Sequence, residues 1–423
     1  MTGWVTGDTT GLAIPVDPAT LRAAGPEFLT TAIRRFGILA ADNKVSRVLR
    51  FEECGGGSTG RKALLDVEYE RPQPGLRAEL FVKFSRDLDN PRRDRGKSQM
   101  ELEVGFAALS VRTDLPVAVP ACVFADYHRE SCTGMLVTER IAYGTGSVEP
   151  HYDKCLDYTM PNALEHYEAL LGSVARLAGV HRSGRLPAAV AEQFRYDADK
   201  VTVGKRVRHS TADRIERVRA LTAFGSAHPG LMSAPTGAFT DRMLADVERI
   251  AAAEDAIMAW LHGTGDHIAL CHWNANVDNA WFWRTTEGAL RNGLMDWGCV
   301  SIMNVAMALW GSLCSAETEM WEKYLDHLLT HFATEYAGAG GPDLDPVILR
   351  TQLMLYVAVM GVAWLLDTPG FLAAAVPDLA EIADRHDPRI SGDESVRAPL
   401  LMLNNMLYLW ETEDFGALLT RLP

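Results

Sequence analysis

The sequence predicts an α+β fold in which a small β-rich part precedes a larger helical part. Two observations support this prediction. Between residues 48 and 141, short apolar runs alternate with glycine and proline turns, which is typical of strands. After about residue 143, apolar residues recur at the spacing of amphipathic helices. With 423 residues, the chain is long enough for two or three domains or for one unit with two lobes.

The first 45 residues are predicted to form a helical extension. Asp17 can cap a helix that begins at Pro18, and a second helix is expected over residues 26–36. The β-rich lobe is expected over residues 46–142, with one helix at residues 100–111. Its predicted strands cover residues 48–54, 63–70, 77–85, 120–127 and 134–141.

The helical lobe is expected over residues 143–423. It begins with a long amphipathic helix over residues 160–184, which Gly184 closes. A further helix is predicted at 239–263. Residues 267–298 contain short apolar runs around a turn, which indicates a hairpin in a helical setting.

The composition excludes several classes of protein. Apolar residues make up 48% of the chain, charged residues 23%, and the net charge is −14, which is typical of a globular protein and unfavourable for binding nucleic acid. The N-terminus shows no secretory signal, and the longest apolar run, residues 353–366, predicts a buried helix rather than a membrane span. The seven cysteines form no CxxC pair. We therefore expect a cytoplasmic protein without nucleic-acid or membrane partners.

A glycine-rich turn lies between the first two predicted strands of the β-rich lobe. It reads Gly55-Gly56-Gly57-Ser58-Thr59-Gly60. Glycine has no Cβ, so backbone N–H groups in such a turn can approach a phosphate closely. The same composition also fits a flexible hairpin loop, and the turn alone does not decide between the two.

A lysine near the end of an apolar strand is the second feature. Lys83 is followed about 20 residues later by Glu101 and Glu103 in a predicted helix. A buried lysine needs a carboxylate partner, and a Lys–Glu pair can hold the phosphates of ATP. We choose Glu103 as the partner because it directly precedes an apolar run. A solvated lysine at a strand end is the alternative.

The third and strongest feature is a polar loop followed by an acidic motif. The loop runs from His272 to Asn279 and the motif is Asp296-Trp297-Gly298. Amide and carboxylate oxygens are hard ligands of the kind that Mg²⁺ selects. Asn279 and Asp296 flank a predicted hairpin, an arrangement by which kinase-type enzymes hold the metal against a triphosphate.

Taken in this order over residues 46–315, the motifs resemble those of the aminoglycoside phosphotransferase and choline-kinase-like superfamily of small-molecule kinases. The resemblance implies a two-lobed, protein-kinase-like fold with ATP between the lobes. It also implies an acceptor site in the helical lobe for a small hydroxylated molecule. The residues that it assigns are Gly56, Gly57, Ser58, Lys83 and Glu103 for the phosphates, Glu139 and Ile141 for adenine, Asn279 and Asp296 for magnesium, and His272, Asn274 and Asp278 for the catalytic loop.

The catalytic loop departs from the superfamily pattern. Asn274 stands where the superfamily has its catalytic aspartate, and Trp273 replaces the preceding glycine. Asparagine cannot accept the hydroxyl proton, which costs about 10²–10⁴-fold in rate. Asp278 could substitute as the base. Three functions stay open: an ATP- and Mg²⁺-dependent phosphotransferase acting on a small-molecule hydroxyl, a pseudokinase-like nucleotide- or ligand-binding protein, and a kinase fold used for nucleotidyl transfer.

Weaker signals have competing interpretations. His327 and His331 form an HxxxH pair that fits either zinc or two surface histidines, and the glutamate of a zinc-protease HExxH motif is absent. Residues 55–60 contain the letters of both GxSxG and GxGxxG, but this turn lies between two predicted strands. It therefore indicates neither the nucleophile elbow of a serine hydrolase nor a Rossmann motif, which needs a following helix. The tryptophans around the loop fit core packing better than a substrate pocket, although the resemblance places Trp273 towards the acceptor. Acidic residues of the last helices are either acceptor ligands or solvated; they are Glu317, Glu319, Asp326 and Asp367.

Overall fold

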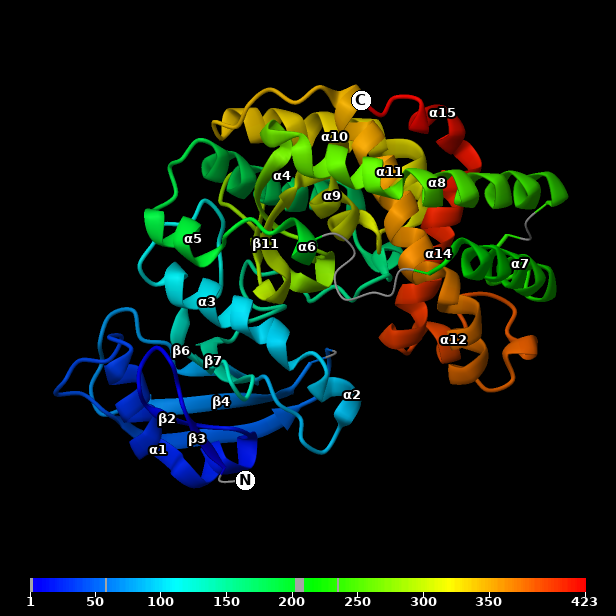
Figure 1. The fold of residues 1–423 in the computed structure, drawn as a ribbon. Helices are drawn as coiled ribbons and strands as arrows, with labels where there is room; N and C mark the ends of the chain where they lie inside the picture. Colours follow the sequence, from blue (N-terminus) through cyan, green and yellow to red (C-terminus); the bar gives the residue numbers. More distant parts are fainter. Residues whose placement is uncertain (1–2, 58, 202–208, 234–235) are drawn as a thin grey trace. The chain divides into compact units, whose positions relative to one another are not determined.

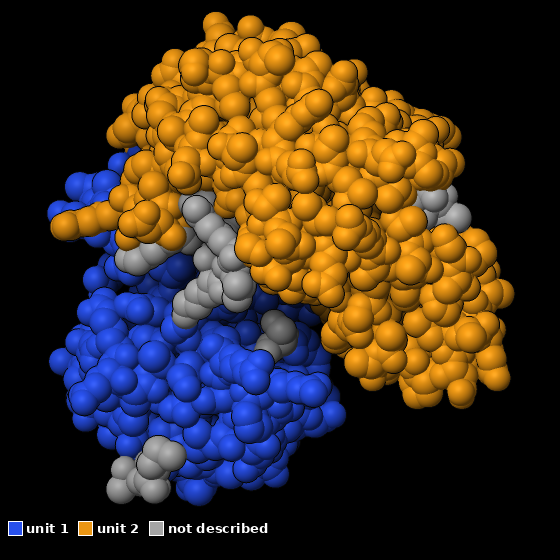
Figure 2. Space-filling view, turned by 45° about the vertical axis from the view of Figure 1, so that its right-hand side comes forward, with its two compact units in different colours: residues 1–148, 186–193, 293–300 blue, residues 149–185, 194–292, 301–423 orange. Residues whose placement is uncertain are grey.

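The computed structural model divides the chain into two compact units, and it describes residues 3–57, 59–201, 209–233 and 236–423. Unit 1 comprises residues 1–148, 186–193 and 293–300 (Figure 2). Unit 2 comprises residues 149–185, 194–292 and 301–423. Unit 1 contains a five-stranded sheet, and unit 2 is mainly helical. The predicted α+β class, with the β-rich part first, is confirmed.

The sheet of unit 1 is antiparallel throughout, with the strand order β3-β4-β5-β7-β6. All five strands that the alternation predicted are present, and each observed strand lies within a few residues of its predicted range. The strands are β3 (Val45–Cys54), β4 (Arg61–Tyr69), β5 (Glu79–Phe84), β6 (Cys122–His128) and β7 (Thr133–Glu139).

The two faces of this sheet bury different helices. Because side chains alternate along a strand, Leu80, Val82 and Phe84 of β5 point to one face, where they join the core around helix α1 (Pro18–Arg35). Lys83 points to the other face, which helix α3 (Met100–Ser110) covers with Met100 and other apolar residues. Figure 1 shows α1 and α3 on opposite sides of the sheet. Unit 1 also contains the short helices α2 (Pro91–Asp94) and α5 (Ala188–Gln193).

The N-terminal segment adds a hairpin that the sequence did not reveal. Strands β1 (Trp4–Thr6) and β2 (Ala13–Pro15) pair antiparallel. Helix α1 follows, and Asp17 caps it by accepting a hydrogen bond from the backbone nitrogen of Thr20 at 2.8 Å. Gly25, with φ of 61°, divides α1 at Pro26 into the two predicted helices.

A buried carboxylate fixes the β1–β2 hairpin to the sheet. Asp126 of β6 is fully buried and accepts hydrogen bonds from the backbone nitrogens of Thr9 and Thr10 at 3.0 and 2.9 Å. It also accepts from the Thr10 hydroxyl and from the nitrogen of Tyr127. Asp126 therefore supplies the buried acceptor that fixes the hairpin turn, beside a backbone hydrogen bond from the Asp8 nitrogen to the Tyr127 carbonyl oxygen at 2.9 Å.

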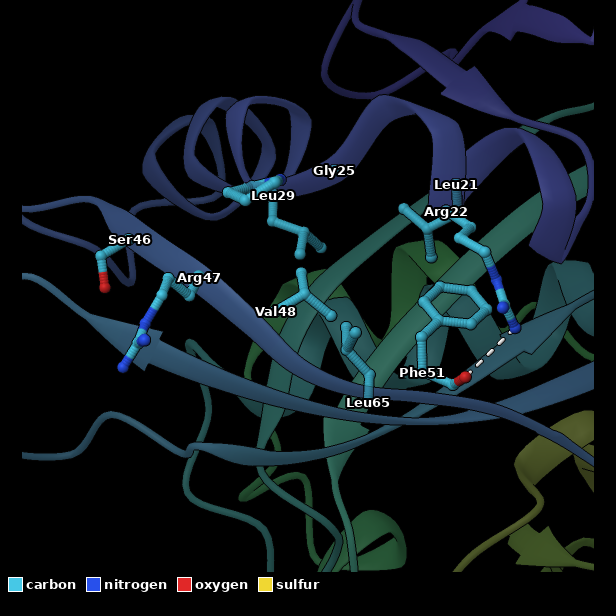
Figure 3. A pocket seen from close by; sticks show the side chains of 10 residues that line it. Leu21, Arg22, Gly25, Leu29, Ser46, Arg47, Val48, Phe51 and Leu65 are labelled. Atoms are coloured by element: carbon cyan, nitrogen blue, oxygen red, sulfur yellow. Dashed lines mark hydrogen bonds between the residues drawn. The ribbon is translucent and has the colours of Figure 1, made fainter.

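A cavity of about 360 Å³ lies between α1 and β3 (Figure 3). Arg22 lies at its edge, where its guanidinium group stacks on the ring of Phe51 and donates to the Phe51 carbonyl oxygen at 3.1 Å. Gly25 and Pro26 also line the cavity, so the kink in α1 coincides with this gap in the packing. Its other lining residues are Leu21, Leu29, Ser46, Arg47, Val48 and Leu65.

Unit 2 packs its helices around two short pairs of strands. Strand β8 (Ile268–His272) pairs with β11 (Val300–Asn304), and β9 (Ala280–Arg284) pairs with β10 (Leu290–Leu294), which is the predicted hairpin. The helices are α4 (Ala163–Arg182), α6 (Ala198–Val201), α7 (Thr211–Ala227), α8 (Gly237–Gly263), α9 (Val305–Leu313), α10 (Thr318–Gly338), α11 (Pro346–Trp364), α12 (Thr368–Ala375), α13 (Pro388–Ser391), α14 (Glu394–Thr412) and α15 (Phe415–Leu419).

Helix α11 contains most of the apolar run that predicted a buried helix. In the described part of the chain, the stretch Pro346–Ala375 is long and apolar enough to cross a membrane by length and composition. Most of its apolar window, 78%, is buried inside the structure. The prediction of a buried helix at this position is confirmed.

We predict that Asp126→Ala lowers the free energy of unfolding by about 2–4 kcal/mol, because several buried donors lose their acceptor together. Urea denaturation of the two proteins measures this difference. Asp89→Ala serves as the control: Asp89 has 87% side-chain exposure and a single 3.4 Å ion pair, so its loss should cost less than about 0.5 kcal/mol. Equal losses in both variants would contradict the role given to Asp126.

Candidate functional site

A buried lysine between two carboxylates forms the centre of the site in unit 1. Lys83 on β5 lies on the α3 face, and its Nζ is 2.6 Å from Glu103 Oε2 and 3.0 Å from Asp296 Oδ1. The side chains of Lys83 and Glu103 are each only 8% exposed. Burial lowers the pKa of Lys83, but Asp296 and Glu103 outweigh burial and raise it, so the ammonium form is favoured. The structure thus pairs Lys83 with Glu103, while Glu101 pairs with Arg129.

Aromatic stacking holds Asp296 beside Lys83. Trp297 stacks on Phe106 of α3 with ring centroids 3.9 Å apart, and its indole nitrogen donates to the Leu294 carbonyl oxygen at 3.0 Å. The backbone nitrogen of Leu294 in turn donates to the Ala118 carbonyl oxygen at 2.9 Å. Asp296 itself has a left-handed backbone, with φ of 57°, and its side chain is 40% exposed. The segment 293–300 is therefore anchored on unit 1 and presents a partly exposed carboxylate.

The glycine-rich turn joins β3 to β4 in unit 1. Gly60 has φ of 57°, and a Cβ there would lie 1.8 Å from the Phe84 carbonyl oxygen, so only glycine fits. Lys62 donates from Nζ to the Gly56 carbonyl oxygen at 2.9 Å. Burial and the neighbouring Lys83 lower the pKa of Lys62, against the effect of Asp296 and Glu103. Ser58, predicted at the phosphates, lies outside the described residues.

The predicted adenine contacts lie where β7 ends. Glu139 is the last residue of β7, and its backbone nitrogen donates to the Ala121 carbonyl oxygen at 2.8 Å. Its carboxylate accepts from the Ala121 nitrogen at 2.9 Å and pairs with Arg77 at 2.8 Å. Ile141 follows and is partly buried. Glu139 is thus tied to unit 1 by both its backbone and its side chain, and adenine binding at this segment stays a prediction.

The polar loop of unit 2 is held by a ladder of amide hydrogen bonds. Asn276 donates from Nδ2 to Asn274 Oδ1 at 2.6 Å, and Ser315 donates from its hydroxyl to Asn276 Oδ1 at 2.6 Å. Asn279 donates from Nδ2 to the Asn274 carbonyl oxygen at 2.9 Å. The backbone nitrogen of Asn274 donates to Nδ1 of the buried His272 at 3.2 Å, so His272 carries its proton on Nε2.

Close packing fixes the loop at the residue before Asn274. The indole nitrogen of Trp273 donates to the hydroxyl of Tyr356 at 3.2 Å. Gly311 of helix α9 lies against the Trp273 backbone, where a Cβ would be 1.8 Å from the Trp273 carbonyl oxygen. The loop conformation therefore depends on a glycine in a neighbouring helix.

Asp278, the alternative base, forms an ion pair within unit 2. Its Oδ2 is 3.4 Å from Lys154 Nζ, and both side chains are largely buried. Burial raises the pKa of Asp278, and Lys154 opposes this effect. The backbone oxygen of Asp278 accepts from His151 Nε2 at 3.0 Å. Asp278 and Asn279 therefore have different partners, as adjacent loop residues usually do.

The two predicted magnesium ligands have suitable chemistry within their own units. Asp296 offers a carboxylate from a partly exposed turn of unit 1. In unit 2, the side-chain nitrogen of Asn279 donates a hydrogen bond to the Asn274 backbone carbonyl oxygen. The side-chain oxygen of Asn279 is therefore the atom that this arrangement offers to a cation. Both are hard oxygen donors that fit Mg²⁺. That they bind one ion together stays a prediction. In the described part of the chain, no group of three or more His, Cys, Asp or Glu residues could hold a metal.

A second buried carboxylate in unit 2 was not found from the sequence. Asp157 is 2% exposed and accepts from the Tyr167 hydroxyl at 2.5 Å and from the backbone nitrogen of Glu317 at 3.2 Å. Burial raises its pKa to about 7, the Tyr167 hydrogen bond works against this, and Glu317 adds to it. Asp157 begins a single 3-10 turn, Asp157–Thr159, in a stretch without periodic pattern, so no sequence signal distinguishes it from other acidic residues.

The HxxxH pair has a structural role in the described helices. His327 Nε2 lies 2.5 Å from Glu168 Oε1, and His331 Nε2 lies 2.9 Å from the Glu168 backbone oxygen. The two histidines of α10 therefore link that helix to α4, which favours the interpretation without zinc.

Comparisons with known proteins find similarity only among solved structures. No family profile and no curated protein sequence matches the chain. A microcompartment-associated aminopropanol kinase is 13% identical, with 94% of this chain and 99% of that chain covered and a TM-score of 0.43. A choline kinase from Cryptosporidium parvum Iowa II is 12% identical, with 90% and 99% covered and a TM-score of 0.43.

A third structure is a GDP complex of wild-type aminoglycoside 2'-phosphotransferase-IIIa. It is 11% identical, with 90% of this chain and 98% of that chain covered and a TM-score of 0.39.

We predict that Asp157 makes the protein less stable as the pH rises from 5 to 7. The folded state keeps the proton up to about pH 7, whereas an unfolded aspartate with a pKa of 3.8 has already released it. The folded state therefore binds more protons in this range, and this group contributes a loss of about 2 kcal/mol between pH 5 and pH 7. Asp157→Asn, which still accepts from Tyr167, should remove this contribution.

Urea denaturation at pH 5 and pH 7 measures the difference between the two proteins. Asp89→Ala, with its exposed carboxylate, should keep the wild-type pH dependence. An unchanged pH dependence in Asp157→Asn would show that Asp157 is ionised throughout this range.

Proposed function

We propose that the protein is a phosphotransferase that uses ATP and Mg²⁺ to phosphorylate a hydroxyl group of a small molecule. The observation that carries this proposal is the buried lysine of unit 1. Lys83 has its ammonium nitrogen 2.6 Å from Glu103 and 3.0 Å from Asp296. A strand lysine held by a helix glutamate, beside an acidic residue that can hold a metal, is the arrangement with which kinases bind the phosphates of ATP.

Each residue of this arrangement has a defined task. Glu103 keeps the Lys83 side chain extended and charged, so that its ammonium group can bind the α- and β-phosphates of the nucleotide. Asp296 is 40% exposed at the carboxylate and would hold Mg²⁺, together with Asn279. Bound Mg²⁺ neutralises phosphate charge and orients the γ-phosphate for transfer.

The polar loop of unit 2 would receive the acceptor. The side-chain oxygen Oδ1 of Asn274 accepts from Asn276, so the side-chain nitrogen Nδ2 of Asn274 is the group that can orient the acceptor hydroxyl. The acceptor oxygen bonds to the γ-phosphorus as the bond from that phosphorus to the ADP oxygen breaks, and the hydroxyl proton passes to water. Asn274 positions the hydroxyl but takes no proton, so slow turnover is expected.

A nucleotide-binding protein without transfer is the second candidate. One observation favours it: the position of the catalytic base holds Asn274, whose amide oxygen is engaged by Asn276 at 2.6 Å. In this case unit 1 would still bind nucleotide through Lys83, and the protein would act by binding a partner rather than by transferring phosphate.

We predict that the purified protein binds MgADP and releases ADP slowly from MgATP in the presence of small alcohols, amino alcohols or sugars. Asp296→Ala should reduce ADP release by at least about 100-fold because a metal ligand is lost. Asn274→Asp should raise it by about 10²–10⁴-fold, since aspartate can keep the acceptor role towards Asn276 and also take the proton. A coupled ADP-release assay measures all three proteins.

Asp42→Ala is the control, because Asp42 lies on the surface of unit 1 in an exposed ion pair with Arg71. Its ADP release should equal that of the wild type. Nucleotide binding without any ADP release, together with a gain in Asn274→Asp, would favour the protein without transfer. No shift of the melting temperature with ADP or ATP would exclude both candidates.

A further inference from the structure

A second lysine lies beside Lys83 on the α3 face of the sheet. Lys62 of β4 is the direct cross-strand neighbour of Lys83 of β5 in the antiparallel register. Directly opposed residues point to the same face, with their Cβ atoms about 4.5–5.5 Å apart. The alternation of side chains along β4 also places Lys62 on the α3 face, because Ala63 and Leu65 belong to the core on the opposite, α1 face. Two ammonium groups are therefore presented side by side.

The two lysines differ in how their charges are compensated. Lys83 has two carboxylate partners within 3.0 Å. In the part of unit 1 that the structure describes, no carboxylate forms an ion pair with Lys62, whose Nζ donates instead to the neutral Gly56 carbonyl oxygen at 2.9 Å. A partly buried ammonium next to another ammonium is unfavourable unless an anion compensates it. Lys62 thus has the environment of a group that binds an anion.

Gly57 of the glycine-rich turn lies directly against the Lys62 ammonium group. Gly57 has φ of 66°, and a Cβ there would lie 2.2 Å from Lys62 Nζ. A side chain at residue 57 would therefore displace the Lys62 ammonium group from its present position. Arg93 also holds the turn, with Nε 2.9 Å from the Gly60 carbonyl oxygen and Nη2 3.3 Å from the Gly56 carbonyl oxygen that Lys62 contacts. Arg93 forms an ion pair with Asp87 at 3.2 Å, whereas Lys62 has no such direct carboxylate partner in the described part of unit 1.

We propose that Lys62 is a second phosphate-binding residue, which with Lys83 makes this face of the sheet a site for a diphosphate or triphosphate chain. The inference rests on the proposed function, because it concerns the phosphates of the same nucleotide. Two adjacent ammonium groups suit a chain of phosphates better than a single phosphate. Lys83 binds from the Glu103 side and Lys62 binds from the side of the glycine-rich turn.

The test is the binding affinity of Lys62→Met, measured by isothermal titration calorimetry on the full chain. The probes are MgADP, inorganic tripolyphosphate with Mg²⁺, and adenosine. We expect about 10- to 100-fold weaker binding of MgADP and tripolyphosphate, because one charged contact is lost, and unchanged binding of adenosine. Lys44→Met removes the same charge from an exposed ion pair with Glu70 and should bind all probes as the wild type does.

A second variant tests the fit between the turn and the lysine. Gly57→Ala should displace the Lys62 ammonium group and weaken MgADP binding in the same way. Gly75→Ala is its control, because Gly75 also has positive φ, at 82°, but a Cβ there meets no atom within 4 Å. Gly75→Ala should leave the affinity for MgADP unchanged.

The outcomes separate this inference from the proposed function. Wild-type affinity of Lys62→Met for MgADP and tripolyphosphate would overturn the role of Lys62 and leave the proposed function in place. An equal loss of adenosine binding would also overturn it, because the effect would then be structural. A wild-type protein that binds neither MgADP nor tripolyphosphate would overturn the proposed function and this inference together.

Discussion

The buried ion pairs of Lys83 impose a constraint on which the sheet unit depends. An ammonium group that is 8% exposed is tolerated only with compensating charge, and here the compensation comes from two other segments. Strand β5 supplies Lys83, helix α3 supplies Glu103, and the distant segment 293–300 supplies Asp296. The stacking of Trp297 on Phe106 brings that last segment to α3. Charge compensation and aromatic packing therefore act together to keep the Asp296 carboxylate next to the Lys83 ammonium group.

Most of the fold of unit 1 could be predicted because its strands are short apolar runs bounded by glycine and proline turns, with clear alternation of apolar and polar residues along β4. The same rule failed at the N-terminus, where the strands Trp4–Thr6 and Ala13–Pro15 are three residues long and too short for periodicity to show. It also placed the start of β4 at residue 63, whereas the strand begins at Arg61. Because of that difference of two residues, Lys62 was not recognised as a site residue: it becomes a cross-strand neighbour of Lys83 only when it belongs to β4.

The candidate site could be predicted where residues in contact lie on elements that follow one another in the sequence. Lys83 and Glu103 lie on consecutive elements, a strand and the next long helix, so their pairing could be predicted. Asp157 and Lys154 lie in an irregular segment, and their environments arise from packing against α4 and the loop at residue 278. No local pattern contains that information. Joint binding of one ion by Asn279 and Asp296 depends on the arrangement of the two units and stays a prediction.

The amide ladder of unit 2 shows how a polar loop can keep its shape without a charged side chain at its centre. Asn276 donates to Asn274, and Ser315 in turn donates to Asn276, through hydrogen bonds that do not need a charge. The same loop leaves no space for a Cβ at Gly311, where the Trp273 backbone lies. A larger side chain at residue 311 would therefore push the Trp273 backbone aside and, with it, the amide network around Asn274, so a residue of helix α9 sets the shape of a loop almost forty positions earlier in the chain.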